Sequence, residues 1–212
     1  MATAGETPEE HLLRSLQVTA TSRFIGAKRL RSHEAWSLWA ISFASLLLIF
    51  VPLFQPFGMK VYLSDSVINL AQILAASIIL VFSLLVNGSK FGLRAELMHG
   101  CALSINSISR RLEESIQQGT TPYDLPKLRK EYEIVLEKHE NHSDLDFMFA
   151  KIRRFSKFYN ITWKQKSVAL IRYWFSYTHY VAILIAEFIF IFMMLVNPSD
   201  ISIINHLGGC LR

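Results

Sequence analysis

The segment "EKHENHSDLDF", residues 137–147, concentrates side chains that could bind a metal ion. His139 and His142 are three residues apart and would share one face of a helix, and Asp144 and Asp146 follow closely. A zinc site needs three or four ligands held together, usually with partners that orient them. Because no remote Cys/His pair completes such a set, we predict that no metal binds here.

A structural interpretation of the same segment fits better. One helix would end near Asn141, and a second would begin after Ser143, whose hydroxyl is a preferred N-cap. Asp146 would then occupy the third helical position, where a carboxylate can complete a capping box. We therefore predict that the cluster is a joint between two helices.

Motifs of common enzyme classes are missing from the sequence. "NGSKFG" has a glycine and a lysine but lacks the spacing of a phosphate-binding loop, and no Gly-x-Ser-x-Gly motif occurs. We predict a protein that is not an enzyme and uses no cofactor.

Three long apolar runs determine the predicted architecture of the chain. No charged residue lies between Ala35 and Met59 or between Ser66 and Ser89, and the run from Tyr173 to Ser199 contains only Glu187. Their central parts, 36–54, 67–86 and 173–196, would be roughly 28, 30 and 36 Å long as helices. Each can cross a bilayer core of about 30 Å. The predicted fold class is an all-α membrane protein with a transmembrane hairpin, a helical segment and a third, C-terminal span.

Basic residues predict the orientation of these spans. Five Lys/Arg precede the first span and fifteen lie between Lys90 and Arg172, whereas only Lys60 lies between the first two spans. Cytoplasmic loops carry the excess of basic residues, so we expect a multi-pass protein of the bacterial inner membrane with a cytoplasmic N-terminus. The predicted parts are a cytoplasmic segment (1–35), a hairpin (36–89), a cytoplasmic helical region (90–172), a span (173–196) and an outward-facing tail (197–212).

Other features agree with this orientation. Five aromatic residues gather at the inferred inner boundary, where their rings suit the lipid–water interface: Trp36, Trp39, Trp163, Tyr173 and Trp174. The net charge of +5 suits a protein that lies against anionic lipid headgroups. Direct contact with nucleic acid is an alternative, but no recognised binding motif accompanies the basic residues. Cys101 and Cys210 would lie on opposite sides of the membrane and cannot pair within one chain.

The cytoplasmic region contains two amphipathic patterns. The first has apolar residues at spacings of three and four: Leu97, Cys101, Ile105, Ile108, Leu112 and Ile116. The second has the same spacings: Leu125, Leu128, Tyr132, Val135 and His139. Such narrow apolar seams predict two helices that pack as a hairpin, although they could equally bind the helices of a partner.

The second span has one polar or small stripe: Asn69, Gln72, Ala76, Leu80, Ser83 and Asn87. Facing lipid, its amides would lack hydrogen-bond partners at a cost of several kcal/mol, so the stripe should face protein or water. It either contacts another helix of the chain or lines a pore in a ring of copies, with Leu80 as a dewetting constriction.

Glu187 presents the same two alternatives. An ionisable residue within a span usually faces the bundle interior or a cavity, so Glu187 either bonds a neighbouring helix or lines a conduit. His179 lies near the interface and is more simply an amphipathic boundary residue than a ligand.

The order of these parts resembles the SLATT family. The matching residues are "RLRSHEAWSLWAIS" entering the hairpin, the cytoplasmic helices, and "YEIVLEKHENHSDLDF" in the second half, so that the resemblance covers roughly residues 25–170. Its most specific piece is Tyr132–Phe147, and the signature joint comprises Tyr132, Asn141, His142, Ser143, Asp144 and Asp146.

The resemblance implies a function. SLATT proteins are bacterial two-span membrane effectors encoded beside nucleotide-signalling or reverse-transcriptase defence genes, and the reverse-transcriptase subgroup is the most similar. It implies an oligomeric, pore-forming anti-phage effector that an associated cytosolic sensor, such as a reverse transcriptase, holds in check. The run 173–196 departs from the two-span family core. The alternative functions are a non-conducting membrane anchor or scaffold for a cytosolic partner, and a small transporter or membrane enzyme built around Glu187 and His179.

Overall fold

The structure is a computed structural model, and it describes residues 7–53, 57, 62–119, 125–156 and 158–196. Every regular element within these ranges is a helix, which confirms the predicted all-α class. Cys210 and the tail predicted to face outward lie outside the described residues, as does most of the link between the first two apolar runs.

The chain divides into two compact units. Unit 1 comprises Met1–Glu34 and Lys90–Ser176, and unit 2 comprises Ala35–Ser89 and Tyr177–Arg212. The N-terminal segment therefore belongs with the predicted cytoplasmic region. Unit 2 contains the apolar runs.

Helix α1 (Pro8–Phe50) is much longer than the first predicted span. It begins in a capping box, in which the Thr7 hydroxyl accepts from the Glu10 amide at 3.2 Å and the Glu10 carboxylate accepts from the Thr7 amide at 3.0 Å. Proline suits the first helical position, because its missing N–H would have no partner there. The helix gives way to a 3-10 turn, η1 (Val51–Leu53), at Pro52.

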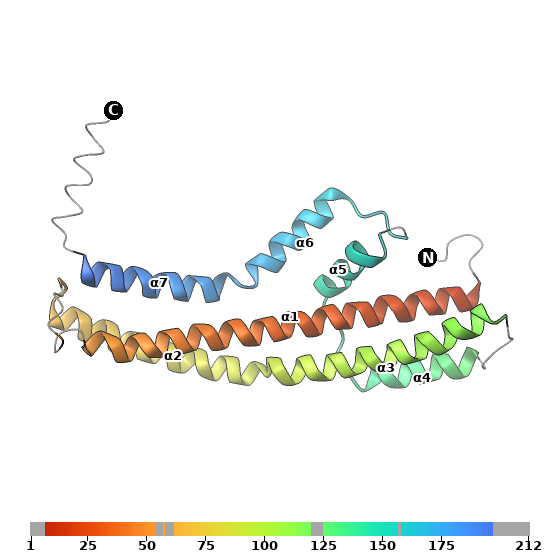
Figure 1. The fold of residues 1–212 in the computed structure, drawn as a ribbon, viewed down its shortest axis with the longest axis horizontal. Helices are drawn as coiled ribbons and strands as arrows, with labels where there is room; N and C mark the ends of the chain where they lie inside the picture. The colour runs from red at the N-terminus through yellow and green to blue at the C-terminus, as the bar shows by residue number, and fades with distance from the viewer. Residues whose placement is uncertain (1–6, 54–56, 58–61, 120–124, 157, 197–212) are drawn as a thin grey trace, which may run out of the picture. The chain divides into compact units, whose positions relative to one another are not determined.

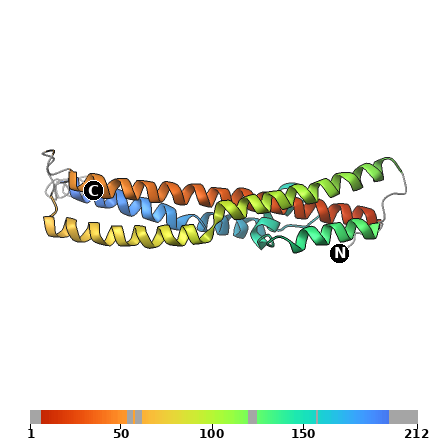
Figure 2. The ribbon, with the colours of Figure 1, turned by 90° about the horizontal axis from the view of Figure 1, so that it is seen from below.

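The core of unit 1 is formed by the first part of α1 together with α3 (Phe91–Gln117) and α4 (Leu125–Glu137), which lie side by side in both views (Figures 1 and 2). Its buried residues are Leu12, Leu16, Ala20, Cys101, Ile105, Ile108, Leu112 and Leu128. The two predicted seams thus pack together, and α1, whose helical N-terminal part the sequence analysis missed, covers them.

The ends of the first seam differ from the prediction. Leu97 and Ile116 are exposed, at 53% and 36% of their surface. Ala95 and Met98 are buried instead, where they pack against Ala27 and Leu30 of α1. The burial of α3 therefore shifts to a neighbouring face at its N-terminal end because α1 lies on that side.

Two shorter helices complete unit 1: α5 (Asp144–Arg154) and α6 (Trp163–Phe175). Helix α4 ends at Glu137, four residues before the predicted end near Asn141, and the His139 amide donates to the Leu136 carbonyl in the closing turn. Lys90 separates α3 from the preceding helix in the left-handed conformation (φ 47°), which is uncommon for a residue with a Cβ.

Unit 2 contains the last part of α1, α2 (Asp65–Ser89) and α7 (Thr178–Leu195) (Figure 1). All three helices are long and apolar enough to cross a membrane. The third begins at Thr178 rather than at Tyr173, because α6 ends at Phe175 and the Ser176 hydroxyl donates to the Tyr173 carbonyl at 2.7 Å. A small buried cluster of Val51, Ile68 and Met194 joins η1, at the end of α1, to α2 and α7.

Candidate functional site

A cavity of about 430 Å³ lies among the three helices of unit 2. Most of its lining is aliphatic, with Ala44 of α1, Ala71 and Ala75 of α2, and Ala182 and Ala186 of α7. Alanine leaves space between helices where larger side chains would fill it. Two polar side chains, Gln72 and Glu187, also line this apolar cavity.

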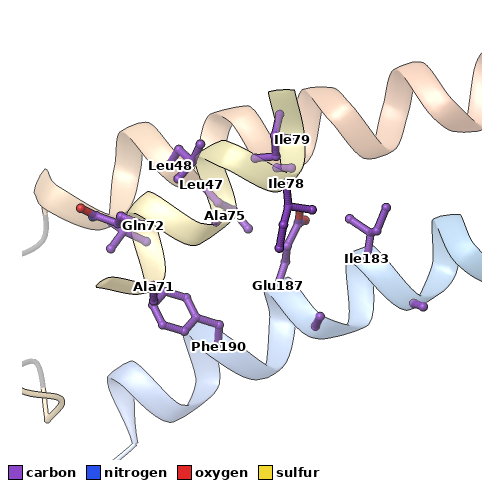
Figure 3. Close-up of a pocket in the computed structure, with 14 residues that line it drawn as sticks. Leu47, Leu48, Ala71, Gln72, Ala75, Ile78, Ile79, Ile183, Glu187 and Phe190 are labelled. Atoms are coloured by element: carbon purple, nitrogen blue, oxygen red, sulfur yellow. The ribbon is translucent and has the colours of Figure 1, made fainter. Parts of the chain in front are cut away.

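The two polar residues come from different helices. Figure 3 shows Glu187 reaching from α7 towards Ile78 of α2, with Gln72 on α2 farther to the left. The Gln72 side-chain nitrogen is buried and has no hydrogen-bond partner among the described residues. An unsatisfied amide in hydrocarbon is unfavourable, so a water molecule or another chain is its expected partner.

The polar stripe of α2 runs along the edge of this buried region. Gln72 and Ser83 are half-buried, whereas Asn69, Leu80 and Asn87 are exposed in the single chain. Asn69 and Asn87 lie near the two ends of α2, where lipid headgroups tolerate polar side chains, and Leu80 is 62% exposed. Contact with other helices of the chain therefore accounts for only one edge of the stripe.

His179 and Glu187 do not form a common site. They are eight residues apart on α7, which separates them by about 12 Å along the helix axis. The His179 ring instead contacts the rings of Phe82 and Tyr180, with centroids 6.4 and 3.9 Å away. His179 therefore packs against aromatic rings of α2 and α7.

The joint between α4 and α5 has the predicted cap. The Ser143 hydroxyl accepts from the Asp146 amide at 3.3 Å, and the Asp146 carboxylate accepts from the Ser143 amide at 3.3 Å. Asn141 and Asp144 are exposed, and His142 is half-buried with its ring 5.7 Å from that of Phe147. Within the described residues, no three His, Cys, Asp or Glu side chains are grouped closely enough to hold a metal ion.

Two arginines of α1 hold this joint. The Arg29 guanidinium donates from Nε to Asp146 Oδ1 at 2.9 Å and from Nη2 to Oδ2 at 3.0 Å, and Asp146 is fully buried. Arg23 is also fully buried and donates from Nη1 to the Glu140 carbonyl at 2.7 Å. A bidentate pair fixes orientation as well as distance, so Asp146 both caps α5 and fastens it to α1.

Tyr132 forms a third connection to α1. Its hydroxyl lies 2.8 Å from the Thr19 hydroxyl, within hydrogen-bond distance. Close packing reinforces the joint at Gly26, where a Cβ would lie 2.9 Å from Asp146 Oδ2 and closer still to the Met98 sulfur. The signature segment is therefore an internal fastening of unit 1.

Burial changes the acidity of two groups in unit 1. Desolvation, followed by the positive charge of Arg23, lowers the pKa of His142 below its ordinary value of 6.5, while Asp146 and Asp144 oppose this change. Desolvation raises the pKa of the Cys101 thiol, and Arg23 opposes it. Both groups are therefore favoured in their neutral forms.

Sequence reasoning did not identify Arg23 and Arg29 as partners of the joint. The Arg29–Asp146 contact joins residues 117 positions apart, and no spacing rule relates them. The sequence did contain one indication: Leu12, Leu16 and Ala20 are spaced four apart, which predicts a helix with one apolar face. Such a face must pack against another helix.

A family model described as SMODS and SLOG-associating 2TM effector domain family 5 (SLATT_5) matches residues 5–193. The chain belongs to this SLATT family. No curated protein and no solved structure matches it.

Membership confirms the family resemblance and corrects its extent. The match begins before α1 and includes most of α7, whereas the sequence analysis limited it to roughly residues 25–170. The third apolar helix is thus part of the matched region rather than an addition to it. Membership in the SLATT family points to a two-span effector of defence systems. The three apolar helices fit a membrane protein.

Proposed function

We propose that this SLATT protein is a pore-forming effector of bacterial anti-phage defence. Copies would assemble through unit 2 in the inner membrane, and unit 1 would shift the assembly between closed and open states when an associated cytosolic sensor is triggered. A reverse transcriptase is the proposed sensor. A trigger of this kind must bind the two states with different affinity.

The observation that carries the proposal is the placement of polar groups in unit 2. Gln72 and Glu187 line a cavity with otherwise largely apolar walls, and the Gln72 amide nitrogen has no partner among the described residues. Polar residues inside a membrane domain are costly and typically mark water-filled or ion pathways. Asn69 and Asn87 extend this polar stripe along the exposed side of α2, which a second copy would cover.

The distribution of basic residues supports the orientation. The Lys90–Arg172 region has fifteen Lys/Arg against ten Asp/Glu, and the segment before the first apolar run has five Lys/Arg. Both lie in unit 1, which we therefore place in the cytoplasm with the N-terminus.

Dye release from proteoliposomes tests the pore. We expect the Asn69→Leu/Gln72→Leu double variant to release dye at least about tenfold more slowly than the unmodified chain, because an apolar lining disfavours water in a pore. Leu74→Ala is the matched control, since Leu74 is 54% exposed and lies on the opposite side of α2. Unchanged release by the double variant would contradict the proposal.

The cellular counterpart is membrane depolarisation on expression, with and without the proposed sensor. Depolarisation that depends on an activated sensor supports gating. A stoichiometric complex with a cytosolic protein, without any ion flux in either state, would instead favour the anchor or scaffold.

The structure weakens the main argument for the scaffold alternative. It rested on two apolar seams free to bind partner helices, but Cys101, Ile105, Ile108, Leu112 and Leu128 are buried inside unit 1. The transporter or enzyme alternative needs His179 and Glu187 together, and their separation of about 12 Å along the axis of α7 does not favour it. We propose that the activity is conduction and that no residue is catalytic.

A further inference from the structure

Helix α6 exposes an extensive apolar side. Trp163, Trp174 and Phe175 are 78%, 66% and 73% exposed, and Val168, Leu170 and Ile171 are all more than half exposed. At 100° per residue, these six side chains fall on an arc of about 160°. So large an apolar patch on a water-facing unit indicates a contact surface.

The other side of α6 is already occupied. Ala169 is only 3% exposed, and the Tyr173 ring lies 5.5 Å from the Phe149 ring of α5 in an edge-to-face arrangement. A capping box between Thr162 and Gln165 fixes the start of the helix. The apolar arc is therefore the side that packing within unit 1 leaves uncovered.

The charges of α6 identify the partner. Lys164, Lys166 and Arg172 are exposed, and the helix contains no acidic residue. At 100° per residue, Lys166 and Arg172 lie about 40° beyond the two edges of the apolar arc, whereas Lys164 lies within it. Exposed tryptophan and phenylalanine beside basic residues are typical of helices that lie in the plane of a membrane surface. Basic residues near such a surface attract anionic lipid headgroups.

Chain connectivity places this helix at a membrane. Only Ser176 and Tyr177 separate Phe175 from Thr178, where the apolar helix α7 begins. Three residue steps span at most about 11 Å. Whenever α7 is inserted, the end of α6 must therefore lie close to the headgroups of one leaflet.

We propose that α6 is an interfacial helix that binds an anionic lipid surface, with its Trp163/Trp174/Phe175 side among the upper acyl chains and its Lys and Arg side chains at the headgroups. This inference goes beyond the proposed pore, because a non-conducting anchor would use α6 in the same way. It requires only that α7 is in the membrane.

The test uses the full chain in nanodiscs that contain phosphatidylglycerol. With Trp36→Phe and Trp39→Phe, the remaining indoles are Trp163 and Trp174. We expect blue-shifted emission that lipid brominated near the headgroup quenches more strongly than lipid brominated near the chain end, because such helices lie about 5–10 Å into the headgroup boundary.

A second measurement uses cysteine labelling in a Cys210→Ser background. Ile171→Cys lies on the apolar arc, and Asn160→Cys is the matched control on the exposed segment before α6. A water-soluble maleimide should modify Ile171→Cys about tenfold more slowly than Asn160→Cys, because apolar surroundings disfavour the reactive thiolate. Replacing Lys164, Lys166 and Arg172 by Gln should reduce this protection in anionic nanodiscs but not in phosphatidylcholine.

Two results would overturn the proposal. Equal labelling of both cysteines, with a native far-ultraviolet circular dichroism spectrum, would show that the apolar side faces water. Protection of Ile171→Cys without quenching by shallow bromine would show that a second copy or another protein covers it. Either result would leave dye release, and therefore the proposed pore, untouched.

Discussion

Unit 1 and unit 2 bury their residues in opposite ways. Unit 1 encloses an apolar core between α1, α3 and α4 and even accommodates a fully buried carboxylate, Asp146, by pairing it with Arg29. Unit 2 leaves large apolar side chains exposed along its helices, such as Ile73 at 66%, Leu84 at 64% and Phe188 at 71%. Unit 1 thus has an enclosed apolar core despite the exposed apolar side of α6, whereas unit 2 presents along its helices the surface expected in lipid.

This difference suggests that buried polar residues contribute to stability in unit 1 and to function in unit 2. In unit 1 the polar contacts hold the fold, so their removal should lower the free energy of unfolding. In unit 2 the polar groups lie in a largely apolar cavity, so their removal should change the proposed conduction more than the free energy of unfolding.

Arg29→Met should have the largest effect on unit 1. It leaves the fully buried Asp146 carboxylate without its cation, and breaking a buried pair in this way costs about 3–5 kcal/mol. Denaturant unfolding in detergent, followed by circular dichroism, measures the loss. Asp146→Asn added to Arg29→Met should restore part of it, because the amide oxygen can still accept from the Ser143 amide.

Arg31→Met is the matched control for that substitution. Arg31 also lies on α1 and pairs with Glu96 of α3, but the two side chains are 50% and 66% exposed. Exposed pairs are worth about 0–1 kcal/mol, so little change is expected. If both variants unfolded alike, the Arg29–Asp146 pair would not hold α5 to α1.

Gly26→Ala should have an intermediate effect, about 1–3 kcal/mol, because the new methyl group would displace the Asp146 carboxylate and the Met98 sulfur. Gly100→Ala is its control, since a Cβ there meets nothing within 4 Å. Alanine is the better helix former, so Gly100→Ala should stabilise α3 by about 0.5–1 kcal/mol. Unfolding midpoints that shift in the same direction for both variants would argue against close packing at Gly26.

The smallest effect concerns pH. Because burial lowers the pKa of His142 in the folded protein, the unfolded chain binds a proton more readily as the pH falls through 6.5. The stability contributed by neutral His142 is therefore complete above pH 6.5 and declines below it. Unfolding of the wild type and of His142→Gln, measured across this range, should show a shallower decline for the variant.

Sequence patterns predicted the features that depend on local composition. Uncharged runs located α2 and the apolar part of α1, and the Ser143–Asp146 spacing located the cap of α5. The helical nature of the N-terminal segment was missed because its buried face uses alanine and the fully buried Arg23 among polar residues. Its polar composition resembled that of a solvated tail.

Features that depend on distant contacts were beyond the sequence. The Arg29–Asp146 pair and the cavity shared by Gln72 and Glu187 join residues from different helices, and helical periodicity does not specify such partners. The end of α6 was missed for a different reason. Tyr173, Trp174 and Phe175 continue the apolar composition of α7, so composition alone ran the two helices together.

The reactivity of the buried Cys101 thiol can be used to measure how often unit 1 opens. It is completely enclosed by the core of α1, α3 and α4, and burial keeps it protonated and unreactive. With Cys210 replaced, a thiol reagent can reach it only when these helices separate. The rate of its modification would therefore measure how often the helices of unit 1 separate, with and without a candidate trigger.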